Sequence, residues 1–143
     1  MSDIYLVGFD GTEASERAAD MAADLAKKSG AALHLILVLE WSPYSFLTKQ
    51  EIEERHQRRE EEMIRAARIV EPVVARYEGQ GITTTSEVRY GHAGEIVSQI
   101  ATQMNAKQIF IGRKGARSLT ERLLGGLAIT LVQISPVPVT VVP

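Results

Sequence analysis

Several features are missing from this chain of 143 residues, and each absence removes a class of function. There is no cysteine, which excludes disulfides, thiolate zinc sites and cysteine nucleophiles. Lys and Arg number 16 against 18 Asp and Glu, so the formal charge of −2 creates no field that gathers nucleic acid. No apolar run approaches the roughly 20 residues of a membrane-spanning helix, and Met1-Ser2-Asp3 lacks the cationic start of a signal peptide. We therefore expect a cytoplasmic protein without a membrane span.

The residues that are present suit one folded domain. Hydrophobic residues make up 45% of the chain and charged residues 24%, which is typical of a globular protein. A domain of this length buries roughly 68% of its extended-chain surface, enough for a stable core. We expect residues 1–143 to form a single domain.

Short apolar runs alternate with amphipathic stretches along the whole chain. The apolar runs predict strands at 4–9, 32–39, 82–90, 107–111 and 137–142. The amphipathic stretches predict helices at about 13–29, 51–77, 95–104 and 126–134. A nearly continuous apolar strand such as 32–39 implies cover on both faces, as in a parallel sheet. The alternation predicts a doubly wound α/β fold with a five-stranded, mainly parallel sheet in the order 3-2-1-4-5 and helices on both faces.

This topology also predicts where a ligand binds. In such sheets the site lies beyond the carboxyl ends of the strands, where the strand order reverses. Here the reversal falls between the strands at 4–9 and 107–111.

The first half of the long helix, from Glu51 to Glu62, is almost entirely charged. Its second half turns apolar from Met63 onward. We expect the charged half to project beyond the sheet into solvent, and the alternative is an arm that binds a partner.

The segment after the fourth strand combines glycines with basic side chains. Its members are Gly112, Arg113, Lys114, Gly115, Arg117, Arg122, Gly125 and Gly126. Glycines let backbone N–H groups approach phosphate oxygens, and a helix that begins near 126 presents free N–H groups to an anion. The alternative is a surface loop with ordinary turn glycines.

The glycine spacing makes the first interpretation more specific. Gly112 is followed after two residues by Gly115 and after nine more by Gly125, with Gly126 next. This pattern resembles the nucleotide-binding signature of the universal stress protein family, Gly-x2-Gly-x9-Gly-Ser/Thr. Further segments resemble that family in the same order, namely Val7 to Thr12, Leu37 to Glu40, Tyr90 to Ile96, Ile109 to Gly112 and Pro138 to Val142.

The resemblance implies ATP binding in the switch-point crevice. Asp10 would accept hydrogen bonds from the ribose hydroxyls, Val38 and its backbone would face adenine, and Arg113 would lie along the phosphates or the ribose. The glycines at 112, 115, 125 and 126 would hold the triphosphate, with Mg²⁺ as a companion ion. The implied site also contains Gly8, Phe9, Gly11 and Leu127.

One position departs from the family pattern. Gly126 stands where the signature has Ser or Thr, so one hydroxyl hydrogen bond to phosphate is missing. Such a bond contributes about 1 kcal/mol. The departure implies weaker binding or a shift toward another adenine nucleotide, cyclic or shorter ones included.

Catalytic machinery is sparse, and we expect no catalytic residue. There is no Gly-x4-Gly-Lys-Ser/Thr phosphate loop. His92 lies in the turn after the third strand, whereas His34 and His56 sit within a strand and on a charged helix face. The predicted function is a nucleotide-dependent sensor that acts through its 113–124 loop, and the alternatives are a protein-interaction module without nucleotide and a slow ATP hydrolase.

The last strand predicts an assembly. Val137 to Val142 would form the edge of the sheet, where Pro138 is tolerated because the edge lacks a neighbour to receive an N–H. A valine-rich edge tends to associate. The resemblance implies a homodimer that pairs this strand across a two-fold axis, and the sequence does not identify a regulatory partner protein.

Overall fold

The computed structural model describes residues 3–40, 48–113 and 126–143. The elements, in chain order, are β1 (Ile4–Gly8), α1 (Glu13–Ser29), β2 (Ala32–Leu39), α2 (Lys49–Glu78), β3 (Thr84–Tyr90), α3 (Ala93–Gln103), β4 (Gln108–Gly112), α4 (Gly126–Ile134) and β5 (Val139–Val142). The five strands form one parallel sheet in the order β3-β2-β1-β4-β5. The predicted fold class, strand order and element sequence are confirmed, with about half of the element ends shifted by one or two residues.

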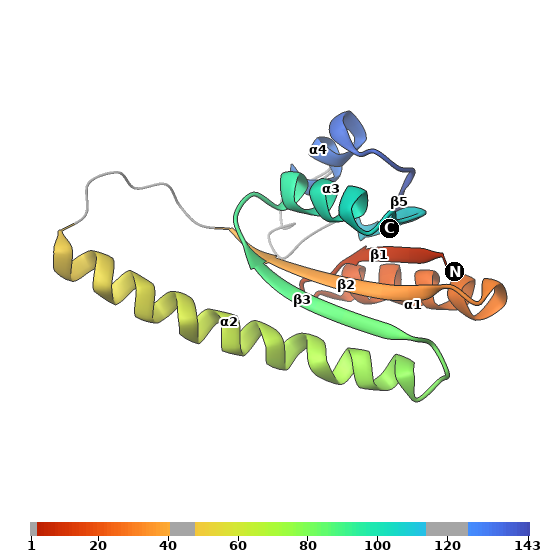
Figure 1. The fold of residues 1–143 in the computed structure, drawn as a ribbon, viewed down its shortest axis with the longest axis horizontal. Helices are drawn as coiled ribbons and strands as arrows, with labels where there is room; N and C mark the ends of the chain where they lie inside the picture. Colours follow the sequence, from red (N-terminus) through yellow and green to blue (C-terminus); the bar gives the residue numbers. More distant parts are fainter. Residues whose placement is uncertain (1–2, 41–47, 114–125) are drawn as a thin grey trace.

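Helices cover both faces of the sheet (Figure 1). Successive strand residues point to opposite faces, so each strand supplies two cores. On one face Leu33, Leu35 and Leu37 pack with the alanines of α1 and the second half of α2. On the other face Leu6 and Ile36 pack with α3 and α4. The central strands are therefore buried on both sides.

Helix α1 packs closely because its buried stripe is made of alanines. The stripe contains Ala18, Ala19, Ala22, Ala23 and Ala26. The Thr12 side chain caps its start by accepting a hydrogen bond from the Ser15 N–H, and Gly30 ends it with a left-handed φ of 75°. Leu25 is 38% exposed. The larger side chain lies beside the alanine stripe, on the rim of the helix contact.

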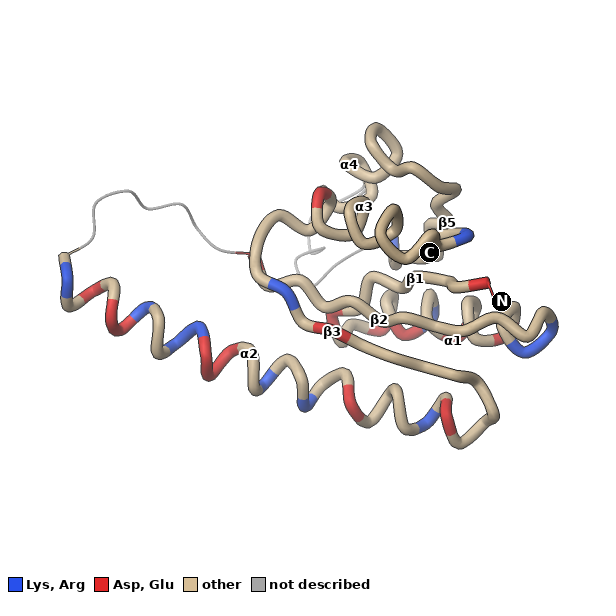
Figure 2. Tube along the Cα trace, viewed as in Figure 1, with Lys and Arg blue, Asp and Glu red and all other residues tan. Residues whose placement is uncertain are grey.

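Helix α2 packs against the sheet only with its second half. Its buried residues are Ala66, Val70, Val73 and Tyr77, whereas the first half extends past the sheet (Figure 1). Figure 2 shows acidic and basic residues alternating along this extension. The expectation of a charged half that projects into solvent is confirmed. We call residues 49–62 the α2 arm.

Within the described ranges, no helix combines the length and the apolar character needed to cross a bilayer.

Candidate functional site

The candidate site lies at the carboxyl ends of β1 and β4, where the strand order reverses. From β1 the chain crosses through α1 on one face to β2, and from β4 it crosses through α4 on the other face to β5. Because the two crossovers leave in opposite directions, this edge is the switch point at which sheets of this kind hold their ligand crevice. Asp10 and Arg113 follow these two strands. Gly115 and Gly125, predicted to bind phosphate, lie outside the described residues, as do Lys114, Arg117 and Arg122.

Asp10 is held in a fixed turn with its carboxylate exposed. Its Oδ1 accepts hydrogen bonds from the Thr12 N–H at 3.0 Å and from the Thr12 hydroxyl at 2.5 Å. Its own N–H donates to the Ser15 hydroxyl at 3.3 Å. Gly11 adopts the left-handed conformation that this turn requires, with φ of 84°. Among the described residues no side chain or backbone group bonds Oδ2, so one oxygen of this exposed carboxylate has no hydrogen-bond partner there.

Gly112 is needed for the packing of α1 against the end of β4. A Cβ at this position would lie 2.7 Å from the Ala14 carbonyl carbon, so α1 begins directly against the end of β4. The N–H of Arg113 is also occupied, because it donates to the Val142 carbonyl at 2.7 Å. The sequence suggested a phosphate-binding or an ordinary turn glycine at 112, and it did not indicate this packing contact. The Arg113 side chain is exposed and remains available to an anion.

The start of α4 lies beside the end of β1. A Cβ on Gly8 would lie 3.5 Å from Leu127 Cδ2 and 3.1 Å from Ile111 Cγ2, which joins β1, β4 and α4 at one point. Gly126, the first residue of α4, has open space where its side chain would be. The first turn of α4 carries no acidic residue, whereas that of α1 carries Glu13 and Glu16. The positive end of the α4 dipole is therefore not compensated by its own side chains and favours an anion.

Two other predicted site residues are placed differently from the glycines. The Phe9 side chain is 2% exposed inside the α1–α2 core, so only its backbone can reach a ligand. The Phe9 N–H donates to the Ile36 carbonyl at 2.8 Å. Of its two backbone groups, the carbonyl is therefore the one that could contact a ligand. Val38 is half-buried near the end of β2 and packs against the α3–α4 core. It stands one strand away from Asp10, at the same edge of the sheet.

The three histidines have separate surroundings. His92 is exposed and begins α3 without a side-chain capping bond. His34 is buried, with Nδ1 2.6 Å from the Thr85 hydroxyl, and His56 lies 3.3 Å from Glu60 on the α2 arm. None is joined to Asp10 by a contact in the described part of the chain. The described residues contain no group of three or more His, Asp or Glu side chains that could hold a metal ion.

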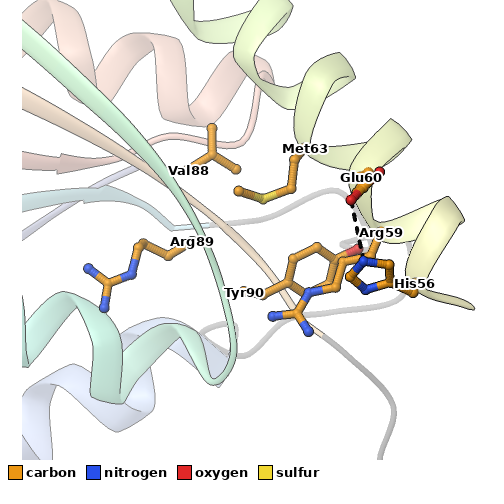
Figure 3. Close-up of a pocket in the computed structure, with 7 residues that line it drawn as sticks. All are labelled: His56, Arg59, Glu60, Met63, Val88, Arg89 and Tyr90. Atoms are coloured by element: carbon orange, nitrogen blue, oxygen red, sulfur yellow. Dashed lines mark ion pairs between the residues drawn. The ribbon is translucent and has the colours of Figure 1, made fainter. Parts of the chain in front are cut away.

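A second hollow, which sequence reasoning missed, lies between α2 and β3 (Figure 3). Its volume is 310 Å³ and its lining residues are His56, Arg59, Glu60, Met63, Val88, Arg89 and Tyr90. The Tyr90 hydroxyl donates to the Glu62 carboxylate, and the Arg59 guanidinium lies 4.5 Å from the centre of the Tyr90 ring. Burial, followed by the bond to Glu62, raises the pKa of Tyr90 to about 12. These contacts fasten only the last residues of the α2 arm to β3, two strands away from the candidate site.

Comparisons with known proteins agree with this arrangement. Universal stress protein Sll1654 from Synechocystis is 30% identical over 143 residues, which are 100% of this chain and 87% of that protein. The solved structure of hypothetical protein MJ0577 is similar, with a TM-score of 0.82 and 22% identity, covering 99% of this chain and 96% of that one.

Two similar structures carry adenine nucleotides. A universal stress protein in complex with cAMP has a TM-score of 0.68 and 19% identity, covering 99% of this chain and 97% of that one. The universal stress protein from Archaeoglobus fulgidus in complex with dAMP has a TM-score of 0.60 and 17% identity, covering 100% and 98%. The sequence pattern of the universal stress protein family matches residues 1–143. With the whole chain matched and the fold shared, this chain belongs to the universal stress protein family.

Proposed function

We propose that the crevice binds an adenine nucleotide, with ATP as the expected ligand, and that the protein is a nucleotide-dependent regulator in the cytoplasm. One juxtaposition carries the proposal. The contact between Gly8 and Leu127 brings the uncompensated N-terminus of α4 beside the β1 end from which Asp10 follows. A nucleotide site needs a group that binds the sugar and a group that binds the phosphate. Here a carboxylate can accept hydrogen bonds from the sugar hydroxyls, and a helix N-terminus can bind the phosphate.

The two nucleotide complexes support this choice of ligand. Both cAMP and dAMP contain adenine, a sugar and one phosphate, and both are bound by proteins with this fold. They also differ in a useful way, because cAMP retains only the 2′-hydroxyl and dAMP only the 3′-hydroxyl. A site that recognises the sugar through Asp10 should respond to each hydroxyl separately.

The phosphates would lie toward α4 and Arg113. Gly126 offers its backbone N–H there without a hydroxyl, and the exposed Arg113 side chain supplies charge. No metal-holding cluster exists among residues 3–40, 48–113 and 126–143. Mg²⁺ would therefore arrive with ATP and keep mostly phosphate and water ligands, as this ion commonly does.

The test is calorimetric titration of the full chain with ATP and dATP. We expect Asp10→Asn to weaken ATP binding at least about tenfold, because the amide accepts fewer hydrogen bonds and bears no charge. Asn retains an oxygen for the bonds to Thr12, so the turn should persist. Asp24→Asn, an exposed change on α1 away from the crevice, is the matched control and should bind as the unaltered chain does.

Two further titrations test which parts of the nucleotide are recognised. The loss caused by Asp10→Asn should be smaller for dATP than for ATP, because one of the two sugar hydroxyls is already absent. Gly126→Ser should tighten ATP binding several-fold by restoring a hydroxyl near the phosphates, about 1 kcal/mol. No heat or thermal shift at millimolar ATP, or equal binding by the Asp10 and Asp24 variants, would overturn the proposal and leave an interaction module of the same fold.

We further propose that β5 pairs across a two-fold axis to form a homodimer, through which a regulatory protein senses nucleotide occupancy. β5 is the last strand of the sheet and is only four residues long. Its valines are half-buried in the single chain, apart from Val142, which is buried. An unpaired, valine-rich edge is the surface that such pairing would cover.

A further inference from the structure

A stripe of exposed charges runs along α2 on a face that the sheet does not cover. Its members follow one another at spacings of three and four residues, namely Glu51, Glu54, Arg58, Glu61, Arg65 and Arg68. Such spacings place side chains on one face of a helix. All six are exposed, and we call them the charge stripe.

The charge stripe is complementary to itself in reverse. Read forward, its signs are negative, negative, positive, negative, positive, positive, and read backward every sign is inverted. A second copy laid antiparallel would set Glu51 against Arg68, Glu54 against Arg65 and Arg58 against Glu61. All three pairings share one two-fold axis, which passes between the two helices level with the midpoint of residues 59 and 60. An isologous contact requires this kind of self-complementarity.

The side chains of the charge stripe are available for such a contact. In the described part of the chain none of the six side chains forms an ion pair or a hydrogen bond, and the bond from Glu51 to Thr48 uses only the Glu51 backbone N–H. The intrahelical alternatives, from Glu54 to Arg58 and from Glu61 to Arg65, are not formed. The contacts between α2 and β3 use other residues. Glu62 accepts a hydrogen bond from Tyr90, and Met63 lines the hollow between the two elements (Figure 3).

The shape of the molecule leaves room for a second helix. The α2 arm extends past the sheet, so much of the stripe lies away from the body (Figures 1 and 2). From residue 51 to residue 68 the stripe spans about 25 Å at 1.5 Å per residue. Antiparallel pairing about the 59–60 axis places the two bodies at opposite ends of the helix pair.

We propose that the charge stripe is a docking surface for a second copy of this chain, paired antiparallel through α2. The contact depends on neither the nucleotide crevice nor the β5 edge. Because its pairs are exposed ions, it should be modest in affinity and sensitive to salt. Combined with pairing at β5, it would join dimers into larger assemblies.

Charge exchange tests the pairing. Each of the three pairings occurs twice between two copies, which makes six ion pairs. Glu54→Arg places an Arg opposite Arg65 of the other copy, and Arg65→Glu places a Glu opposite Glu54. Each variant therefore makes two of the six pairs repulsive. Each variant alone should associate at least about tenfold more weakly in sedimentation equilibrium at about 50 mM salt. A mixture of the two restores every pair and should associate as the unaltered chain does. Residues 54 and 65 are about 16 Å apart along one helix, too far for an intramolecular explanation.

Controls separate this contact from the others. Glu53→Arg and Lys49→Glu make the same charge changes at exposed positions outside the stripe and should leave association unchanged. Circular dichroism verifies that each variant keeps its helix. Raising salt to about 0.5 M should abolish the difference between stripe and control variants, since the pairs are then screened.

Cross-linking locates the contact directly. The chain has no cysteine, so a single Gln57→Cys provides one labelling site beside the proposed axis. A short bismaleimide should join two copies at low salt, whereas Gln80→Cys should not react because antiparallel pairing separates its two copies by about 60 Å. Absence of the Gln57 cross-link, or mixed variants that associate no better than each alone, would overturn the proposal, whatever the outcome for nucleotide or β5.

Discussion

At the residue scale, the same amino acid serves different ends according to its neighbours. Gly112 and Gly126 both belong to the glycine pattern that suggested phosphate binding. In the structure a side chain at 112 would collide with the backbone of Ala14, whereas a side chain at 126 would meet nothing within 4 Å. The first glycine is needed by the fold, and the second is free to serve a ligand.

Alanine substitutions should separate these two roles. We expect Gly112→Ala to lower the free energy of unfolding by about 1–3 kcal/mol, because α1 or β4 must shift to admit the methyl group. Gly126→Ala should leave stability unchanged or raise it by up to about 1 kcal/mol, since alanine favours the helix. Urea unfolding of both variants measures the difference. Equal stability for the two variants would contradict the packing role of Gly112.

At the element scale, α2 owes its direction to contacts at both ends of its packed half. Near the middle of α2, the Glu62 carboxylate accepts a hydrogen bond from the Tyr90 hydroxyl on β3. Near its end the Tyr77 hydroxyl donates to Asp20 on α1 at 2.6 Å. Burial, assisted by these hydrogen bonds to carboxylates, raises the pKa of both tyrosines. The helix is therefore fixed where it packs, and its charged arm extends as a rigid continuation.

This arrangement predicts a loss of stability at alkaline pH. A tyrosine in the unfolded chain loses its proton near pH 10, whereas the pKa of Tyr90 in the folded chain is about 12. Its contribution is therefore complete below about pH 10 and is lost as pH rises through about 12. Tyr90→Phe should reduce the fall in unfolding free energy between pH 9 and pH 11, and Tyr77 should account for a remaining fall of the same sign. Urea unfolding at the two pH values tests this, and an unchanged slope would contradict it.

At the scale of the whole molecule, β5 is the edge of the sheet at which the proposed homodimer would pair. The carbonyls of Pro138 and Val142 accept hydrogen bonds from backbone N–H groups of residues 109 and 113 at β4. The backbone groups of the even-numbered residues in this segment therefore face β4. The N–H groups of Val139 and Val141 therefore point outward, because successive residues alternate between the two sides of a strand. Edge pairing would use these outward groups.

Removing one outward donor should weaken the proposed β5 dimer. Val141→Pro deletes the outward N–H and leaves the hydrogen bonds to β4 in place. We expect the mass in sedimentation at about 0.5 M salt, where charge contacts are screened, to fall from dimer to monomer. Val141→Thr keeps the N–H and should remain dimeric. A Pro variant with undiminished mass would exclude pairing at this edge.

The fold and the location of the site followed from local patterns. Apolar periodicity predicted the elements. The caps that end or begin the helices in the structure, among them Thr12, Gly30 and Thr48, are also short-range. The right-handed crossover rule then limited the topology, so Asp10 and Gly112 could be placed at one edge. The elements depend on residues within a few positions of one another, whereas the strand order depends on how the elements alternate along the whole chain.

Other features required the tertiary structure because they join distant segments. The contact between Gly112 and Ala14, the bond between Tyr90 and Glu62, and the position of Gly8 beside Leu127 each link separate elements. The charge stripe was present in the sequence all along, but only the packing of α2 shows that its six residues share an uncovered face. The sequence by itself determined the elements and their order, since hydrophobic periodicity and capping are local. The tertiary structure decided which of their surfaces stay open, since burial depends on what the whole chain packs against them.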